Sequence, residues 1–252
     1  MNGPAAAETA FQTGQKLVTA GRDFDFIDFQ SLDRAVIRDG GIEVSGERYR
    51  VLVLPAMRAL RWSTIEKAAA FKKAGGIVIA LGSLPEASDR AGRNDPELDA
   101  VVRGLFGVSA HEAASVRNTM SDGSSAGGTG LFVTGPDDAP AVIDRLIPKD
   151  VSSSKPVMAL HRKAGSRDIY MVLGAEKNTD CTFRASGRAE LWDPWTGRTL
   201  PLPAQSAHDG LTTVRMPLES YEAQVIVFTP GKPARTVEST DLDDVASISK
   251  NK

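Results

Sequence analysis

Residues 49–82 read YRVLVLPAMRALRWSTIEKAAAFKKAGGIVIALG, and this stretch decides the fold. Val51–Leu54 is an unbroken apolar run that ends at Pro55, and Ile77–Leu81 is a second run enclosed by glycines. Such runs are typical of strands in a parallel sheet, because helices cover both faces of that kind of sheet. We therefore expect two neighbouring strands that are buried on both faces.

The residues between the two runs predict a helix. Ser63 and Glu66 have the spacing of a capping box, in which each side chain accepts a backbone N–H at the start of a helix. Ile65 and Ala68 share an apolar face, and Gly75 is a typical helix end. Strand, helix and strand at this spacing predict a right-handed βαβ unit, and hence an α/β fold.

Shorter elements are predicted on both sides of this unit, after a disordered start at residues 1–6. Upstream they are a helix at Ala7–Ala20, a strand within Asp23–Phe29, a helix at Ser31–Arg38 and a hairpin with arms at Ile42–Val44 and Glu47–Tyr49. Downstream they are a loop at 84–94, helices at Pro96–Phe106 and Asp138–Leu146, and a strand at Leu131–Thr134.

The pattern changes near Val151, where Ser152–Ser154 indicates a linker. Strand patterns and turn residues then alternate at short intervals up to residue 229, which is typical of a β-sandwich. The candidate strands are Val157–Arg162, Asp168–Leu173, Cys181–Ala185, Ala189–Trp192, Val214–Pro217 and Gln224–Phe228. We predict an α/β domain at residues 7–150, a β-sandwich at 151–230 and a disordered tail at 231–252.

Composition excludes several classes of partner. The 30 basic and 32 acidic residues give a net charge of -2, so no electrostatic footprint for nucleic acid or an acidic membrane is present. No apolar run approaches the roughly 20 residues that a membrane-spanning helix needs. The first residues contain neither a basic region nor an apolar one, so no signal peptide is predicted. No cofactor or metal motif is found.

Ser83 and Cys181 are the two candidate nucleophiles for an enzymatic role. Ser83 follows the second apolar run, where doubly wound folds bind ligands, but Ala80–Pro85 does not match the G-x-S-x-G nucleophile elbow. We interpret Ser83 as a polar loop residue. Cys181 lies in the β-rich half, whereas an amidotransferase-type cysteine would occupy a strand-to-helix turn in the α/β half. We interpret Cys181 as a small buried apolar residue.

General acid–base groups give no clear constellation. His111, His161 and His208 each lie alone, without a second His or Cys at ligand spacing, which indicates structural or surface roles. Asp23 and Asp25 would share a face of the predicted strand. Glycoside hydrolysis needs two carboxylates about 5–9.5 Å apart, but these two fit a solvated strand end better.

A tryptophan-rich turn is the one candidate binding feature. Ala189–Pro203 predicts a hairpin whose turn contains Asp193, and Trp192 and Trp195 flank that turn. The two indoles could stack on a sugar face, or they could cover the end of the sandwich. The second reading is the more common one.

The phrase ELWDPWTGRTLPLP (190–203), preceded by HRKAGSRDIYMVLG (161–174), resembles the region behind the catalytic barrel in bacterial α-L-rhamnosidases of glycoside hydrolase family 106. GRDFDFID (21–28), ERYRVLVLP (47–55) and AGGIVIALGSLPEASD (74–89) extend the resemblance in consistent order. These segments are similar to the flavodoxin-like, amidotransferase-like domain that follows the barrel there and in some β-galactosidases.

The resemblance implies several expectations. In such proteins the catalytic carboxylates and any metal lie on the barrel, so no residue of this chain is carried over as catalytic. The family's α/β domain would begin with a strand before the helix at Ala7–Ala20, which predicts a truncated sheet with an unpaired edge or an apolar groove. A barrel domain or a separate chain could pack there. Such enzymes are usually exported. Gly174-Ala175-Glu176 replaces the asparagine of the family pattern.

Three hypotheses follow. The leading one is a noncatalytic accessory segment of an α-L-rhamnosidase-like glycoside hydrolase, whose whole enzyme would release terminal rhamnose. The second is a carbohydrate-binding module that uses Trp192, Asp193 and Trp195. The third is a small amidotransferase-like hydrolase that uses Ser83 or Cys181.

Overall fold

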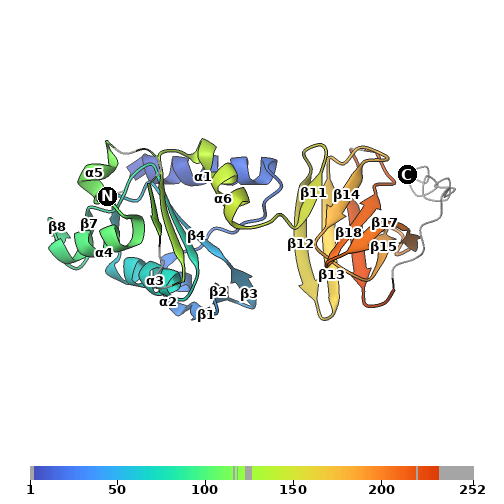
Figure 1. Ribbon diagram of the computed structural model, residues 1–252, viewed down its shortest axis with the longest axis horizontal. Coiled ribbons are helices and arrows are strands. Elements are labelled where there is room, and N and C mark those ends of the chain that lie inside the picture. Colours follow the sequence, from blue (N-terminus) through green and yellow to red (C-terminus); the bar gives the residue numbers. More distant parts are fainter. Residues whose placement is uncertain (1–2, 116, 118, 123–126, 220, 233–252) are drawn as a thin grey trace. The chain divides into compact units, whose positions relative to one another are not determined.

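The computed structural model describes residues 3–115, 117, 119–122, 127–219 and 221–232 (Figure 1). The chain divides into two compact units. Unit 1 contains residues 1–16 and 25–142, and unit 2 contains residues 17–24 and 143–252. The division falls inside helix α6 (Ala139–Leu146), before the predicted boundary at residue 150, and a short N-terminal segment belongs to unit 2.

Unit 1 is built on a four-stranded sheet with the order β4-β6-β10-β9. Strands β4 (Val51–Pro55), β6 (Ile77–Leu81) and β10 (Thr129–Val133) are parallel, and β9 (Thr119–Asp122) is antiparallel to β10. Helix α3 (Trp62–Lys73) connects β4 to β6, so the predicted strand, helix and parallel strand are confirmed. All five residues of β6 are buried. Burial alternates along β4, because one face of this strand is covered less completely than the other, so the prediction that both strands are buried on both faces was wrong for β4.

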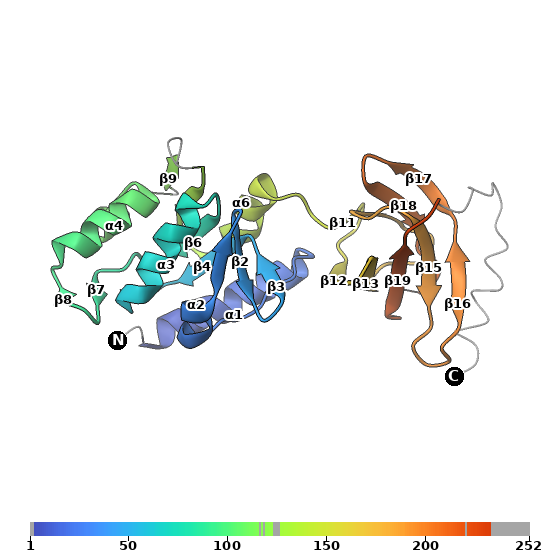
Figure 2. The same ribbon diagram turned by 90° about the horizontal axis from the view of Figure 1, so that it is seen from below.

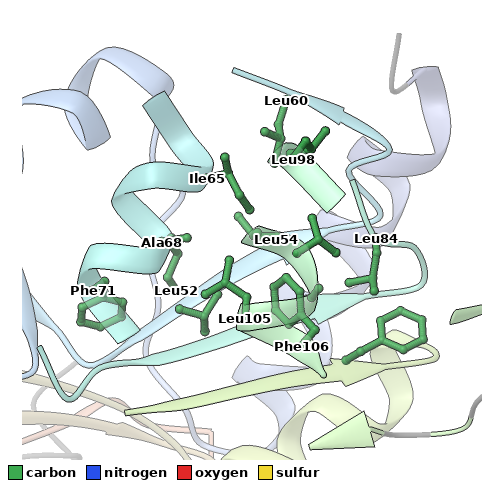
Figure 3. Close-up of a cluster of buried hydrophobic side chains, with 14 of the residues drawn as sticks. Leu52, Leu54, Leu60, Ile65, Ala68, Phe71, Leu84, Leu98, Leu105 and Phe106 are labelled. Carbon is green, nitrogen blue, oxygen red and sulfur yellow. The ribbon is translucent and has the colours of Figure 1, made fainter. Parts of the chain in front are cut away.

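Helices α2 (Phe29–Arg34), α3 and α4 (Pro96–Phe106) pack with one face of this sheet. Figure 3 shows the resulting core, in which side chains from β4, α3 and α4 meet. Its labelled members are Leu52, Leu54, Leu60, Ile65, Ala68, Phe71, Leu84, Leu98, Leu105 and Phe106. Figure 1 shows helix α1 (Gly3–Thr19) on the opposite side of the sheet from α3. The α4 boundaries are as predicted, because Pro96 opens the helix and Gly107 ends it at a φ of 76°.

The start of α3 corrects the predicted capping box. Arg61 occupies the N-cap position without a side-chain cap, and the Trp62 N–H donates instead to Asp89 Oδ1 at 2.7 Å. A distant carboxylate thus satisfies an N–H in the first turn of α3, and the predicted Ser63–Glu66 capping box is not the cap of this helix. A capping box does form at α5 (Ala110–Ala113), between Ser109 and Glu112.

The N-terminal region also differs from the prediction. Helix α1 begins at Gly3, so residues 3–6 are helical where disorder was predicted; Pro4 and the following alanines favour a helix start. Residues 22–28 form no strand. The Asp25 carboxylate accepts the Tyr49 hydroxyl, and Asp28 caps α2 by accepting the Ser31 N–H at 2.9 Å. Side-chain bonding therefore replaces strand pairing here.

Two small sheets complete unit 1. Strands β1 (Val36–Arg38), β2 (Gly41–Val44) and β3 (Glu47–Tyr49) form an antiparallel sheet, which confirms the predicted hairpin and shortens the predicted helix before it. Positive φ angles at Ser45 and Gly46 match a tight hairpin turn. Strands β5 (Ala59–Leu60), β7 (Ala87–Ser88) and β8 (Gly92–Arg93) form the other small sheet. The predicted loop at 84–94 was therefore wrong for residues 87–88 and 92–93. A short helix η1 (Pro136–Asp138) precedes α6.

Unit 2 contains two antiparallel sheets, which Figure 2 shows from the side. The first has the order β11 (Val151–Ser153), β14 (Asp180–Phe183), β18 (Leu211–Arg215), β17 (Ala204–His208). The second has the order β12 (Met158–Ala164), β13 (Arg167–Leu173), β19 (Gln224–Thr229), β15 (Arg188–Trp192), β16 (Thr199–Leu202). Each predicted strand region contains a strand.

A shared core joins the two sheets of unit 2 in a sandwich-like arrangement. Tyr170, Phe183 and Phe228 meet in it, with ring centroids 5.0–5.8 Å apart. The predicted linker at Ser152–Ser154 was wrong for its first two residues, because Val151–Ser153 pairs with β14. Residues 233–252, most of the predicted tail, lie outside the described residues. No helix in the described part of the chain is long and apolar enough to cross a membrane.

Candidate functional site

The β15–β16 turn is held by Asp193. This buried carboxylate accepts the Trp195 N–H at 3.0 Å and the Thr196 hydroxyl, and its backbone N–H donates to the Arg198 carbonyl at 2.9 Å. The Thr196 hydroxyl and the backbone amides keep the pKa of Asp193 below its usual range. Gly197 completes the turn at a φ of 72°. Asp193 therefore orders the turn, and its oxygens are engaged within the protein.

The two tryptophans of this turn differ in exposure. Trp195 is 83% exposed, so its indole is open to solvent. Trp192 is half-buried on β15, where its Nε1 donates to Glu190 at 3.1 Å. The Arg167 guanidinium also lies 5.5 Å from the Trp192 ring centroid. Only Trp195 of this pair presents a largely open surface for stacking.

Ser83 lies in the loop after β6, as the sequence indicated. Gly82, at a φ of 72°, turns the chain there, and the Ser83 N–H donates to the Leu81 carbonyl at 2.8 Å. The Ser83 hydroxyl is buried, and no residue in the described part of the chain hydrogen-bonds it. A serine nucleophile needs an adjacent base, so this geometry provides no activation.

Cys181 is fully buried on β14 within the core of unit 2. Burial raises the pKa of its thiol to about 11. The thiol therefore stays protonated near neutral pH, whereas a catalytic cysteine reacts as the thiolate. This placement agrees with the interpretation of Cys181 as a small buried apolar residue.

His161 has partners that the sequence did not indicate. Its Nε2 lies 3.0 Å from Asp168 Oδ1, and its Nδ1 lies 3.4 Å from Asp150 Oδ2. Its ring stacks on Tyr170, with centroids 4.2 Å apart and an interplanar angle of 8°. The signal for this cluster was present in the β12–β13 hairpin, because His161 and Tyr170 are register partners.

The remaining titratable candidates stay apart. His208 is exposed on β17 beside Asp209, and His111 is exposed on α5. Asp23 pairs with Arg162 at 2.7 Å in unit 2, whereas Asp25 bonds Tyr49 in unit 1, so the two do not act as one pair. Within the described ranges, no group of three or more His, Cys, Asp or Glu side chains could hold a metal ion.

No protein-family model and no curated protein sequence matches this chain. Solved structures do match its fold. A rhamnosidase from Novosphingobium sp. PP1Y is 21% identical with a TM-score of 0.61, over 86% of this chain and 20% of that one. Gan42B, a GH42 β-galactosidase from G. stearothermophilus, is 13% identical with a TM-score of 0.57, over 90% and 37%. A β-galactosidase from Bacillus circulans sp. alkalophilus is 13% identical with a TM-score of 0.51, over 89% and 38%.

These similarities show a fold that is shared with parts of glycoside hydrolases. Each one covers at least 86% of this chain and so includes most of both units. The chain spans about a fifth of the rhamnosidase and less than two fifths of either β-galactosidase. The comparisons therefore show the fold alone, an α/β unit followed by a β-sandwich-like unit.

Proposed function

We propose that this chain is a noncatalytic accessory segment of a glycoside hydrolase that resembles the α-L-rhamnosidases. The observation that carries the proposal is the structural match to a rhamnosidase across 86% of the chain. That match has a higher identity and TM-score than those to the two β-galactosidases, 21% and 0.61 against 13% and at most 0.57. The order of the motifs from GRDFDFID to WDPWTG supports the same choice.

The described side chains support a noncatalytic role. Cys181 is a buried thiol, the Ser83 hydroxyl has no activating base, and Asp23 and Asp25 are engaged separately. The third hypothesis, a small amidotransferase-like hydrolase, is not supported by the surroundings of Ser83 and Cys181. The resemblance implies that the catalytic carboxylates of the whole enzyme lie on a barrel, and its reaction would release terminal rhamnose.

The free side of β4 is our proposed contact for such a barrel, as a domain or as a separate chain. The Arg50 carbonyl accepts the Ile77 N–H at 3.2 Å, so the backbone groups of Val51 and Val53, which alternate with it, point away from β6. Pro55 is the next residue of that set, and a proline fits an edge because it has no N–H to pair. No strand in the described ranges pairs with this side of β4.

Two measurements test the accessory role. The purified chain should hydrolyse neither an aryl α-L-rhamnoside nor an aryl β-D-galactoside. Turnover that is lost in Ser83→Ala or Cys181→Ala would overturn the proposal.

The native protein in its own cells should have a mass well above 26.8 kDa, either as a longer chain or in a complex. A native species of 26.8 kDa without a partner would also count against it.

A separate chain on the β4 edge can be distinguished from a longer polypeptide. Val53→Lys places a charge at the proposed contact, and we expect it to reduce a native complex to the mass of the chain alone. Val36→Lys is the matched control, because Val36 is half exposed on β1. If both variants keep the complex, the contact lies elsewhere.

A second candidate function is carbohydrate binding at the β15–β16 turn. Trp195 favours it, because an exposed indole on a turn ordered by Asp193 is pre-organised for stacking on a sugar face. Rhamnose-containing oligosaccharides should change the tryptophan fluorescence of the wild type and not of Trp195→Ala. Trp192→Phe, at a half-buried position, should keep the response. No change at about millimolar sugar would reject this function.

A further inference from the structure

His161 lies between two carboxylates that approach its two ring nitrogens separately. Asp168, on β13, faces Nε2, and Asp150, which precedes β11, faces Nδ1. A neutral imidazole has one N–H donor, so one carboxylate would face a lone pair. The imidazolium can donate to both. The geometry therefore favours the protonated ring, and stacking on the buried Tyr170 fixes its orientation.

The carboxylate that faces Nδ1 belongs to a stretch that connects the two units. Residues 143–150 are the part of unit 2 that continues from unit 1 through α6. The Arg184 N–H donates to the Asp150 carbonyl at 2.8 Å, which attaches the end of this stretch to the sandwich. The His161–Asp150 contact adds a second attachment at the same residue.

The other stretch that connects the units is held by the neighbour of His161. Residues 17–24 also belong to unit 2, and Arg162 pairs with Asp23 at 2.7 Å. Arg22 bonds Asp144 and the Ile147 and Pro148 carbonyls, which ties the two connecting stretches to each other. The adjacent residues His161 and Arg162 on β12 therefore contact both connecting stretches.

We propose that His161 is a protonation-controlled clamp that holds residues 143–150 on the sandwich of unit 2. The Arg162–Asp23 contact on the other stretch is permanent, because the guanidinium stays charged at all physiological pH values. The His161–Asp150 contact is switchable, because an imidazole loses its charge near neutral pH. This role does not depend on the glycoside hydrolase proposal, and it involves His161, Arg162, Asp168 and Tyr170 of the segment 161–174.

The charges around His161 give the sign of the switch. The hydrogen bond that His161 donates to Asp150, together with the one it donates to Asp168, raises the pKa of His161 against the opposing effect of burial. A raised pKa means that the clamp is closed below the ordinary value of about 6.5 and opens as the pH rises through the folded-state pKa. The pKa of Asp150 is lowered, chiefly by His161, so the clamp also opens in strong acid. The other charged or titratable groups in this cluster are Lys163, Arg184, Arg22 and Tyr170.

Nuclear magnetic resonance can test the clamp on the intact chain. The His161 ring should titrate with a pKa above about 6.5. The Arg184 amide reports closure, and its hydrogen exchange should be compared with that of the Val214 amide within the same core. As the pH rises through the titration, the ratio of the Arg184 exchange rate to the Val214 exchange rate should rise. The expected rise is about tenfold for each pH unit by which closing the clamp raises the His161 pKa. In His161→Gln the ratio should stay high at every pH.

Two further variants make the test specific. Asp168→Asn removes one carboxylate and should lower the His161 pKa, so the change in Arg184 exchange should move to lower pH with it. His208→Gln alters an exposed histidine on β17 and should behave as the wild type. A His161 pKa at or below about 6.5 would overturn the proposal. So would an Arg184 exchange ratio that does not change while the wild-type His161 titrates.

Discussion

In unit 1 the best-defined core lies between a parallel sheet and helices α3 and α4, whereas in unit 2 it lies between two antiparallel sheets. The first core is mostly aliphatic, and much of it comes from the continuous stretch of residues 52–106 (Figure 3). The second is centred on Tyr170, Phe183 and Phe228, which three separate strands supply. Local sequence patterns therefore specify more of unit 1, and long-range strand pairing specifies more of unit 2.

The largest effects are expected from core truncation, one in each unit. Phe71→Ala and Phe228→Ala should each cost about 3–5 kcal/mol of unfolding free energy, because each removes a fully buried ring. Hydrogen exchange should show the loss in the unit that carries the substitution. Phe11→Ala, at a residue 68% exposed, is the control and should stay within about 0.5 kcal/mol. Equal losses in both units after either substitution would show that they unfold together.

Close backbone contacts give the next pair. A Cβ at Gly128 in unit 1 would collide with the Lys72 and Gly76 carbonyls, and one at Gly187 in unit 2 would collide with the Thr229 carbonyl. Gly128→Ala and Gly187→Ala should each lower stability by about 1–3 kcal/mol in chemical denaturation, because backbone atoms must shift. Gly187 also has a φ of 120°, which adds strain. An unchanged denaturation midpoint in either variant would contradict the close approach.

Features that depend on local sequence were predictable, and features that depend on long-range pairing were not. The β6 run and the helix between Pro96 and Gly107 were predictable, because apolar periodicity and terminal residues act locally. The cap of α3 was not, because Asp89 lies 27 positions from Trp62 and a nearer serine offered the same chemistry. The edge position of β4 depends on which strands pair, and an apolar run alone does not contain that information.

The two candidate sites differ in the same way, because one is formed by neighbouring residues and the other by residues that are distant in sequence. The exposed tryptophan turn was predictable because Asp193, Trp195 and Gly197 interact within five residues. The His161 cluster was not predictable from the spacing of histidines and cysteines, because Asp150 reaches it from before β11. Hairpin register would have paired His161 with Tyr170 from the sequence, but it would not have placed Asp150.

The pH dependence of stability should differ between the units. In unit 1 the hydrogen bond from Arg90 lowers the pKa of Asp95, the N-cap of α4, so its contribution is present above the unfolded pKa and is lost as the pH falls. In unit 2 the contribution of His161 is lost as the pH rises through its raised pKa. The melting temperature of Asp95→Asn should therefore lie furthest below that of the wild type near neutral pH, and this difference should shrink on the acid side. In His161→Gln the difference from the wild type should shrink above neutral pH, and the opposite ordering would contradict both assignments.

The smallest effects come from two glycines that have open space for a methyl group and differ in backbone conformation. Gly104 lies within helix α4, where alanine restricts the unfolded chain, so Gly104→Ala should stabilise unit 1 by about 0.5–1 kcal/mol. Gly165, in the β12–β13 turn of unit 2, has a φ of 60°, so Gly165→Ala should destabilise by about 1 kcal/mol. Chemical denaturation of the two variants should give shifts of opposite sign. Shifts of the same sign would mean that available space, and not backbone conformation, decides the outcome at these positions.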